Sequence, residues 1–157
     1  MNAEESITIE SLMTAIGAKV TGVDLSRQMD DDTFAVLHQA VLDYLILYIP
    51  GQDVPPDAQI AFTERFGAVE PHPLKSRAGH PEYEGLLVLE NAPERRGARN
   101  DFWHSDITCA PSPPSISVLH ALTVPDGKGD TLFCNMYRAW DRLPEYLKYQ
   151  LEGQSAE

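Results

Sequence analysis

The chain has 157 residues, 43% of them hydrophobic and 23% charged, which is an ordinary composition for one globular domain with a core. Twelve basic and 24 acidic side chains give a net charge of -12, which disfavours nucleic acid and anionic membranes as partners. No apolar stretch is long enough to span a bilayer, no secretory signal is visible and two cysteines make no disulfide framework, so we expect a reduced, cytoplasmic protein.

The first half of the chain predicts two short strands around a turn at Gly17, then a helix, a buried strand and a second helix. The first helix begins with crowded aspartates, which the helix dipole favours. It carries an apolar stripe at helical spacing, formed by Phe34, Leu37, Val41 and Leu45. The second helix is entered through prolines and is expected to end at Gly67. The predicted elements are strands 7–12 and 18–26, helix 29–45, strand 45–49 and helix 55–67.

The second half predicts mainly short strands, followed by one or two helices. The stretch GLLVLEN is continuously apolar, which is typical of a strand buried on both faces. No helix separates each strand from the next, so a doubly wound parallel sheet is disfavoured, and we expect an antiparallel sheet or barrel with helices outside it. The predicted elements are strands 85–91, 102–109, 115–124 and 131–136, a turn at 125–130, and helices within 136–153 with Pro144 near the start of the second.

The stretch FWHSD, residues 102–106, contains the strongest chemical signal. On a strand, residues two apart project to the same face, so His104 and Asp106 would enter one cavity while Ser105 points away. One imidazole and one carboxylate, joined by a second histidine, make the facial triad of non-haem Fe(II) oxygenases, which leaves positions open for a cosubstrate and O₂. By itself the triplet is weak, because such a pair is often only a hydrogen-bonded pair on a surface.

The neighbouring motifs make the signal specific. The chain carries, in order, AKVTGVDLS, GQDVPPDAQIAFTERFG, NDFWHSD, GKGDTLFCNM and LPEYLKYQLEG, and it resembles the Fe(II)/2-oxoglutarate-dependent dioxygenases of the taurine and aryloxyalkanoate type over nearly all its length. The resemblance implies an α+β fold, a double-stranded β-helix (jelly-roll) with flanking helices, as a single dioxygenase domain over residues 1–157. It also implies hydroxylation of a small anionic organic substrate, such as an alkylsulfonate or aryloxyalkanoate, with O₂ and decarboxylation of 2-oxoglutarate to succinate.

The resemblance also assigns roles to individual residues. His104 and Asp106 match the first two iron ligands, and Thr131 matches a threonine whose hydroxyl binds a carboxylate of 2-oxoglutarate. His72 and Asn100 match residues of the substrate pocket. Without the resemblance, Thr131 reads as an ordinary strand residue, His72 as an exposed loop residue and Asn100 as a turn residue.

The family's second histidine ligand and the arginine that binds 2-oxoglutarate lie further along than Glu157, and neither has a match here. We therefore interpret the chain as the N-terminal portion of such an enzyme, which stops before the last core strands and is inactive by itself. Two alternatives stay open: a non-catalytic half-fold that serves as an interaction module, and a metal-independent cupin-like binding protein. A homo-oligomer is compatible with all three.

Overall fold

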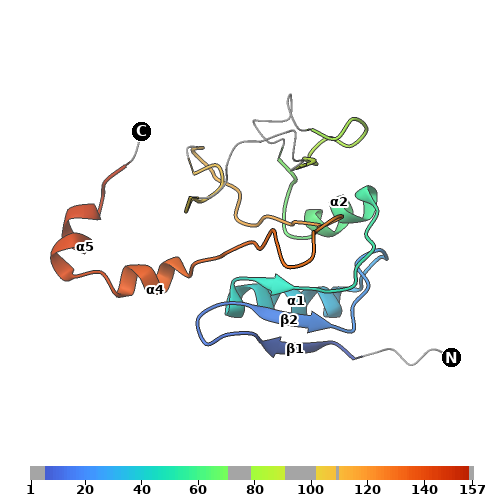
Figure 1. The fold of residues 1–157 in the computed structure, drawn as a ribbon, viewed down its shortest axis with the longest axis horizontal. Coiled ribbons are helices and arrows are strands. Elements are labelled where there is room, and N and C mark those ends of the chain that lie inside the picture. Colours follow the sequence, from blue (N-terminus) through green and yellow to red (C-terminus); the bar gives the residue numbers. More distant parts are fainter. Residues whose placement is uncertain (1–5, 71–78, 91–101, 109, 156–157) are drawn as a thin grey trace. The chain divides into compact units, whose positions relative to one another are not determined.

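The computed structural model describes residues 6–70, 79–90, 102–108 and 110–155 (Figure 1). By its internal contacts the chain divides into two compact units. The first unit comprises Met1–Asp53 and Leu119–Glu157, and the second comprises Val54–Val118. His104 and Asp106 belong to the second unit, whereas Thr131 belongs to the first.

The first unit contains a three-stranded sheet with the strand order β1-β2-β3. Strand β1 (Thr8–Ser11) pairs antiparallel with β2 (Ala18–Thr21), and β2 pairs parallel with β3 (Leu47–Tyr48). The hairpin turns at Gly17, whose φ of 93° lies in the left-handed region that glycine adopts without strain. The three strands predicted in this half are confirmed, but each is shorter than predicted: β2 ends at Thr21 instead of Ser26, and β3 has only two residues.

Helix α1 (Asp31–Tyr44) has well-defined ends that the sequence explains. At its start the Asp30 carboxylate accepts hydrogen bonds from the backbone N–H of Thr33 at 2.7 Å and from its hydroxyl at 2.8 Å, which caps the helix. At its end Leu45 adopts a φ of 66° and its N–H donates to the Val41 carbonyl. The predicted helix over 29–45 is confirmed.

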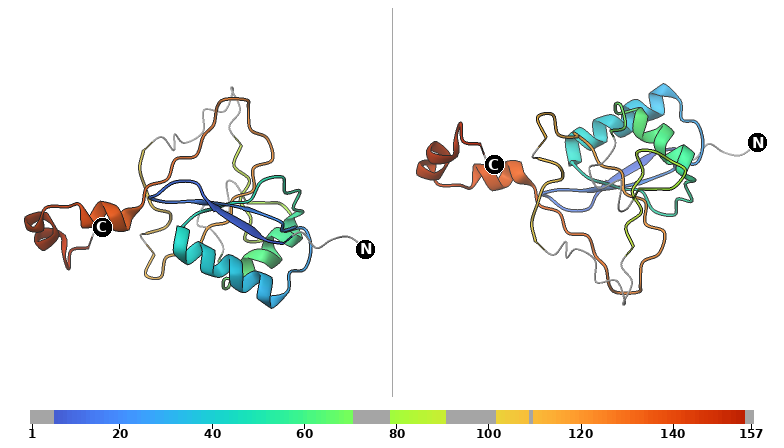
Figure 2. Two further views of the ribbon diagram at one scale, coloured as in Figure 1. Left: turned by 90° about the horizontal axis from the view of Figure 1, so that it is seen from below. Right: turned by 90° about the horizontal axis from the view of Figure 1, so that it is seen from above.

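The core of the first unit lies between α1 and the sheet, and Figure 2 shows the helix running along one face of the strands. Leu37 of α1 and Val20 of β2 are both fully buried, and Leu37 is one of the positions in the predicted apolar stripe. Beside this core Gln52 joins two loops, since its side chain accepts from the Leu25 N–H and donates to the Val23 carbonyl.

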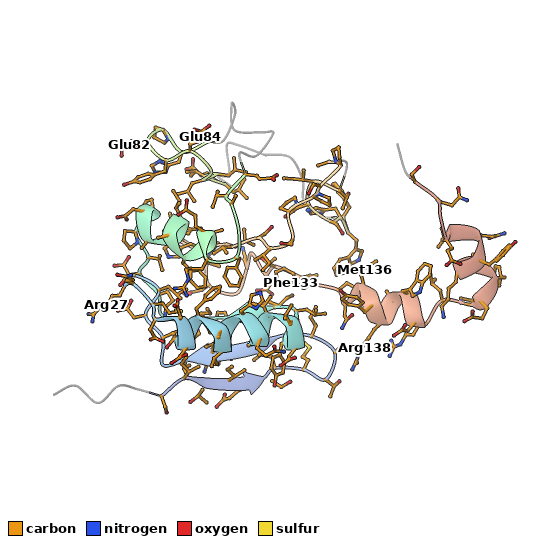
Figure 3. The ribbon with its side chains drawn as sticks, turned by 180° about the vertical axis from the view of Figure 1, so that it is seen from behind. Arg27, Glu82, Glu84, Phe133, Met136 and Arg138 are labelled. Atoms are coloured by element: carbon orange, nitrogen blue, oxygen red, sulfur yellow. The ribbon has the colours of Figure 1, made fainter. Side chains whose placement is uncertain are left out.

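The C-terminal residues of the first unit form two short helices, as predicted, with Pro144 at the start of the second. Helix α4 spans Met136–Asp141 and helix α5 spans Glu145–Leu151. Asn135 caps α4 by accepting from the Arg138 N–H at 3.0 Å, while its amide donates to the Ala15 carbonyl at 2.7 Å. Arg138, labelled on α4 in Figure 3, donates through Nη2 to the Thr14 carbonyl at 2.6 Å.

The second unit contains helix α2 (Pro56–Glu64), which begins with proline at its first position, as predicted. The helix ends at Glu64, before the predicted end at Gly67, with Arg65 as its C-cap. Gln59 of α2 donates to the Val118 carbonyl at 3.3 Å, which connects the two ends of the unit. Across the described ranges, no helix of either unit has the length and apolar character that a membrane crossing requires.

Among the residues that the structure describes, none of the strands predicted in the second half is formed. Within the described residues 85–90, Leu87 makes an isolated bridge to Gly79, and residues 102–108 form a bend and a turn. The described parts of 115–124 and 131–136 contain no strand, and Leu122 is 80% exposed. The predictions recognised apolar segments correctly, but a strand also needs a neighbour to pair with its N–H and C=O groups, and these segments have none among the described residues. The sheet of three strands therefore does not show a jelly-roll.

Candidate metal-binding site at His104 and Asp106

The structure brings His104 and Asp106 together. The imidazole Nε2 lies 3.4 Å from the Asp106 Oδ1, and the two side chains are 42% and 60% exposed. The segment is a bend followed by a turn at 106–108 rather than the predicted strand. The two groups are adjacent, as predicted, but both are exposed rather than enclosed in the predicted cavity. Two potential metal ligands thus stand side by side on an accessible segment.

The other ring nitrogen defines the tautomer of His104. Its Nδ1 lies 3.0 Å from the backbone carbonyl oxygen of Phe102, an atom that can only accept a hydrogen bond. Nδ1 therefore carries the hydrogen and donates it. In the neutral ring, Nε2 then has a free lone pair, and that lone pair faces a carboxylate oxygen.

Because the imidazole lone pair and the carboxylate oxygen are both acceptors, a cation placed between them would interact favourably with both. A proton on Nε2 would make an ordinary ion pair, whereas a metal ion would bind both atoms at once. Donors held about 2.0–2.2 Å from one ion in neighbouring positions lie about 3.0–3.5 Å apart, and the observed separation of 3.4 Å falls in this interval. The pair thus fits two adjacent positions on one divalent ion.

The turn that follows His104 has a strained residue at its centre. Ile107 adopts a φ of 50°, which is rare for a β-branched side chain, and its carbonyl accepts from the Ala110 N–H at 3.0 Å. Such conformations cost on the order of 1–3 kcal/mol and persist where the surroundings impose them. The turn begins at Asp106, the second residue of the candidate pair.

A third ligand is not part of this arrangement in the ranges that the structure describes. No group of three or more histidine, cysteine, aspartate or glutamate side chains there is placed to hold a metal ion. His80, in the same unit, uses its Nδ1 to accept from the backbone N–H groups of Glu82 and Tyr83, each at 3.2 Å. His80 is thus engaged in its own turn.

Of the remaining predicted site residues, only Thr131 lies within the described part of the chain, and it belongs to the first unit. Thr131 is an exposed residue of the first unit and follows a turn in which the Lys128 N–H donates to the Pro125 carbonyl at 3.2 Å. That turn, with Gly127 and Gly129 at positive φ, confirms the one predicted at 125–130. His72 and Asn100, the predicted substrate-binding residues, lie outside the described residues.

The sequence indicated the His104–Asp106 pair but missed the role of Phe102. The rings of Phe102 and His104 have centroids 5.3 Å apart at an interplanar angle of 52°, in addition to the hydrogen bond from Nδ1. A backbone carbonyl is present at every position, so no sequence pattern could have shown this contact. The only available signal was an aromatic residue two positions before a candidate ligand.

Comparison with a family model and with known proteins gives an independent view of the chain. The model described as "Taurine catabolism dioxygenase TauD, TfdA family" matches residues 8–157. Such a match includes both units and all the predicted site residues.

Three relatives illustrate the similarity. An alkylsulfatase of Acinetobacter baylyi is 33% identical over 94% of this chain and 45% of its own length. An alpha-ketoglutarate-dependent 2,4-dichlorophenoxyacetate dioxygenase of Cupriavidus pinatubonensis is 31% identical over 97% of this chain and 58% of its own. The crystal structure of a taurine dioxygenase from Burkholderia xenovorans matches with a TM-score of 0.75 and 28% identity, over 94% of this chain and 52% of that one. The chain thus spans about half the length of the curated relatives it matches.

Proposed function

The chain belongs to the TauD/TfdA family of taurine catabolism dioxygenases, and from this we propose that it forms part of an Fe(II)/2-oxoglutarate-dependent dioxygenase. The proposed reaction is hydroxylation of a small anionic organic substrate, with decarboxylation of 2-oxoglutarate to succinate. For the whole domain we infer the double-stranded β-helix with flanking helices, on the ground of family membership and not of the three-stranded sheet.

One observation supports the proposal most directly: the His104 Nε2 and the Asp106 Oδ1 lie 3.4 Å apart on an exposed segment. Imidazole and carboxylate are two of the three ligands in a facial triad, and this triad leaves coordination positions for a cosubstrate and O₂. We propose that these two side chains bind Fe(II) and that a third ligand comes from outside the described residues. When bound, the iron would supply the activation of O₂.

The residues of this chain would then bind and orient the reactants. We propose that the Thr131 hydroxyl donates a hydrogen bond to a carboxylate of 2-oxoglutarate, which is a charge-assisted and therefore strong contact. His72 and Asn100 are proposed to contact the substrate, on the basis of the family resemblance alone. The donation of the Nδ1 hydrogen to Phe102 leaves the Nε2 lone pair of His104 available for the metal.

The substrate class follows from the relatives. Their names refer to alkyl sulfates, 2,4-dichlorophenoxyacetate and taurine, all of which are small organic compounds with an anionic group. We therefore propose a sulfonate, sulfate ester or aryloxyalkanoate as the substrate. The alternative of an interaction module has no supporting observation.

Anaerobic titration of the 157-residue chain with Fe(II) tests the metal site. We expect weak binding, because two protein ligands leave most of the coordination sphere to water, and we expect His104→Ala or Asp106→Ala to reduce the affinity at least tenfold. His80→Ala is the matched control, since it removes an imidazole of the same unit that is engaged in a turn. Equal affinity in all four proteins would contradict the proposal.

The same samples test catalysis. With two ligands in the described residues, we expect the chain by itself to show no iron–2-oxoglutarate charge-transfer band and to form no succinate. Succinate formation by the purified chain would show that the third ligand is already present, and it would overturn this expectation while supporting the dioxygenase assignment.

A further inference from the structure

We propose that Phe102 is a positioning residue for His104. Its backbone carbonyl holds the imidazole in the Nδ1–H tautomer, and its ring limits the rotation of the imidazole, so that Nε2 is presented beside Asp106 as a lone-pair donor. This inference rests on the proposed function, because the Nε2 lone pair would be used by a bound metal ion.

The carbonyl argument rests on a single hydrogen bond. The distance of 3.0 Å from the His104 Nδ1 to the Phe102 oxygen is the usual length for an N–H donor and a carbonyl. The hydrogen bond joins residues that are two positions apart in the sequence, so it can form without contacts from the rest of the fold. Histidines that bind metals commonly donate their second nitrogen to a carbonyl or carboxylate in this way, which fixes the tautomer and the orientation of the ring.

The ring argument rests on where Phe102 lies. Phe102 is 65% exposed, so burial of its apolar surface does not explain the position of its side chain. Its contact with the His104 ring, with centroids 5.3 Å apart, is within the range of favourable aromatic pairs. The Phe102 ring contacts the His104 imidazole, and the Phe102 carbonyl accepts a hydrogen bond from it. Together the two contacts restrict both side-chain torsions of His104.

His80 provides an internal reference with the opposite chemistry. Its Nδ1 accepts from two backbone N–H groups, so its hydrogen must reside on Nε2. The second unit thus contains two histidines whose neutral tautomers differ, and one measurement can compare them in the same molecule.

The test is nuclear magnetic resonance of the metal-free chain with ¹⁵N-labelled histidine, at a pH of about 8.5, where imidazoles are mostly neutral. Long-range ¹H–¹⁵N correlations distinguish the two tautomers. We expect His104 to be mainly Nδ1–H and His80 mainly Nε2–H. A His104 ring that is mainly Nε2–H would overturn the proposal.

Three changes at residue 102 separate the carbonyl from the ring. An ester in place of the amide between Phe102 and Trp103 weakens the carbonyl as an acceptor, and we expect the Nε2–H fraction of His104 to rise severalfold. Phe102→Leu keeps the carbonyl and loses the ring, so a smaller rise is expected, and Phe102→Tyr should restore the original fraction. An unchanged His104 tautomer in both the ester and the leucine variant would overturn the proposal, and His80 should not respond in any of them.

Addition of Mn(II) to the same samples keeps this inference distinct from the proposed function. Paramagnetic broadening of the His104 signals, but not those of His80, supports the metal site. If Mn(II) broadens neither ring while the tautomers are as expected, the positioning role of Phe102 stands and the proposed metal site at His104 and Asp106 fails.

Discussion

At the scale of single residues, His80 and His104 of the second unit show how one ring nitrogen determines the use of the other. The His80 Nδ1 accepts from the N–H groups of Glu82 and Tyr83, and its ring meets the Tyr83 ring at a centroid distance of 5.0 Å. His80 therefore organises its turn, which includes Glu82 (Figure 3), whereas the His104 Nε2 lies 3.4 Å from the Asp106 Oδ1. The sequence alone does not distinguish the roles of these two histidines.

His80→Ala is expected to loosen that turn. Loss of one acceptor leaves two N–H groups to water, and each such bond contributes about 1 kcal/mol, so the amides of Glu82 and Tyr83 should exchange with solvent about fivefold faster. His80→Asn is the control, because its side-chain oxygen can accept from an N–H two residues on. Hydrogen exchange measured by nuclear magnetic resonance checks the prediction, and equal rates in all three proteins would refute it.

At the scale of elements, the start of α1 makes stability depend on pH. The two hydrogen bonds from Thr33, first that of its backbone and then that of its hydroxyl, lower the pKa of Asp30 below its usual value. A carboxyl whose pKa is lower in the folded chain stabilises the fold above its unfolded pKa, and this contribution is lost as the pH falls through the folded pKa. The charge also lies at the favourable end of the helix dipole.

Asp30→Asn should remove that pH dependence while keeping an acceptor for the cap. Urea unfolding at about pH 7 and about pH 3 should therefore show a smaller loss of stability on acidification in the variant than in the parent chain. Asp30→Ala should be less stable than Asp30→Asn at both values, because no side chain replaces the cap. A parent and an asparagine variant with the same loss on acidification would contradict this.

Helix α4 offers a second test, because Asn135 has two separable roles. Asn135→Asp keeps an oxygen for the Arg138 N–H but loses the donor to the Ala15 carbonyl, whereas Asn135→Ala loses both. We expect the aspartate variant to lose about 1 kcal/mol and the alanine variant about 2 kcal/mol of unfolding free energy. Thermal and urea unfolding provide the measurement, and an aspartate variant as stable as the parent would show that the Ala15 contact contributes nothing.

At the scale of the whole molecule, local patterns were predictable and distant pairings were not. Helix α1 is encoded by its own residues, namely the cap at Asp30 and an apolar stripe that contains Leu37. The apolar segments 115–124 and 131–136 were predicted as strands because their residues favour strands, but strand formation depends on a partner distant in the sequence.

In the candidate site, too, local features were predictable from the sequence and distant contacts were not. The His104–Asp106 pair depends on a spacing of two residues, so it was predictable even though the segment is a bend and a turn. The contact from Phe102 depends on backbone geometry and could not be predicted. The proposed role of Thr131 depends on which distant residues share a cavity, and only the family resemblance indicates it.

The parallel pairing of β2 with β3 has a consequence for the order of folding. The hairpin of β1 and β2 closes over a few residues, and hairpins form in about 1–10 μs. β3 can add to β2 only after the chain from Gly22 to Ile46, which includes α1, has crossed over and docked. The kinetic barrier of the first unit should therefore lie at this crossover: a chain shortened to residue 44 would keep a transient hairpin, but it would have no lasting sheet on which α1 could rest.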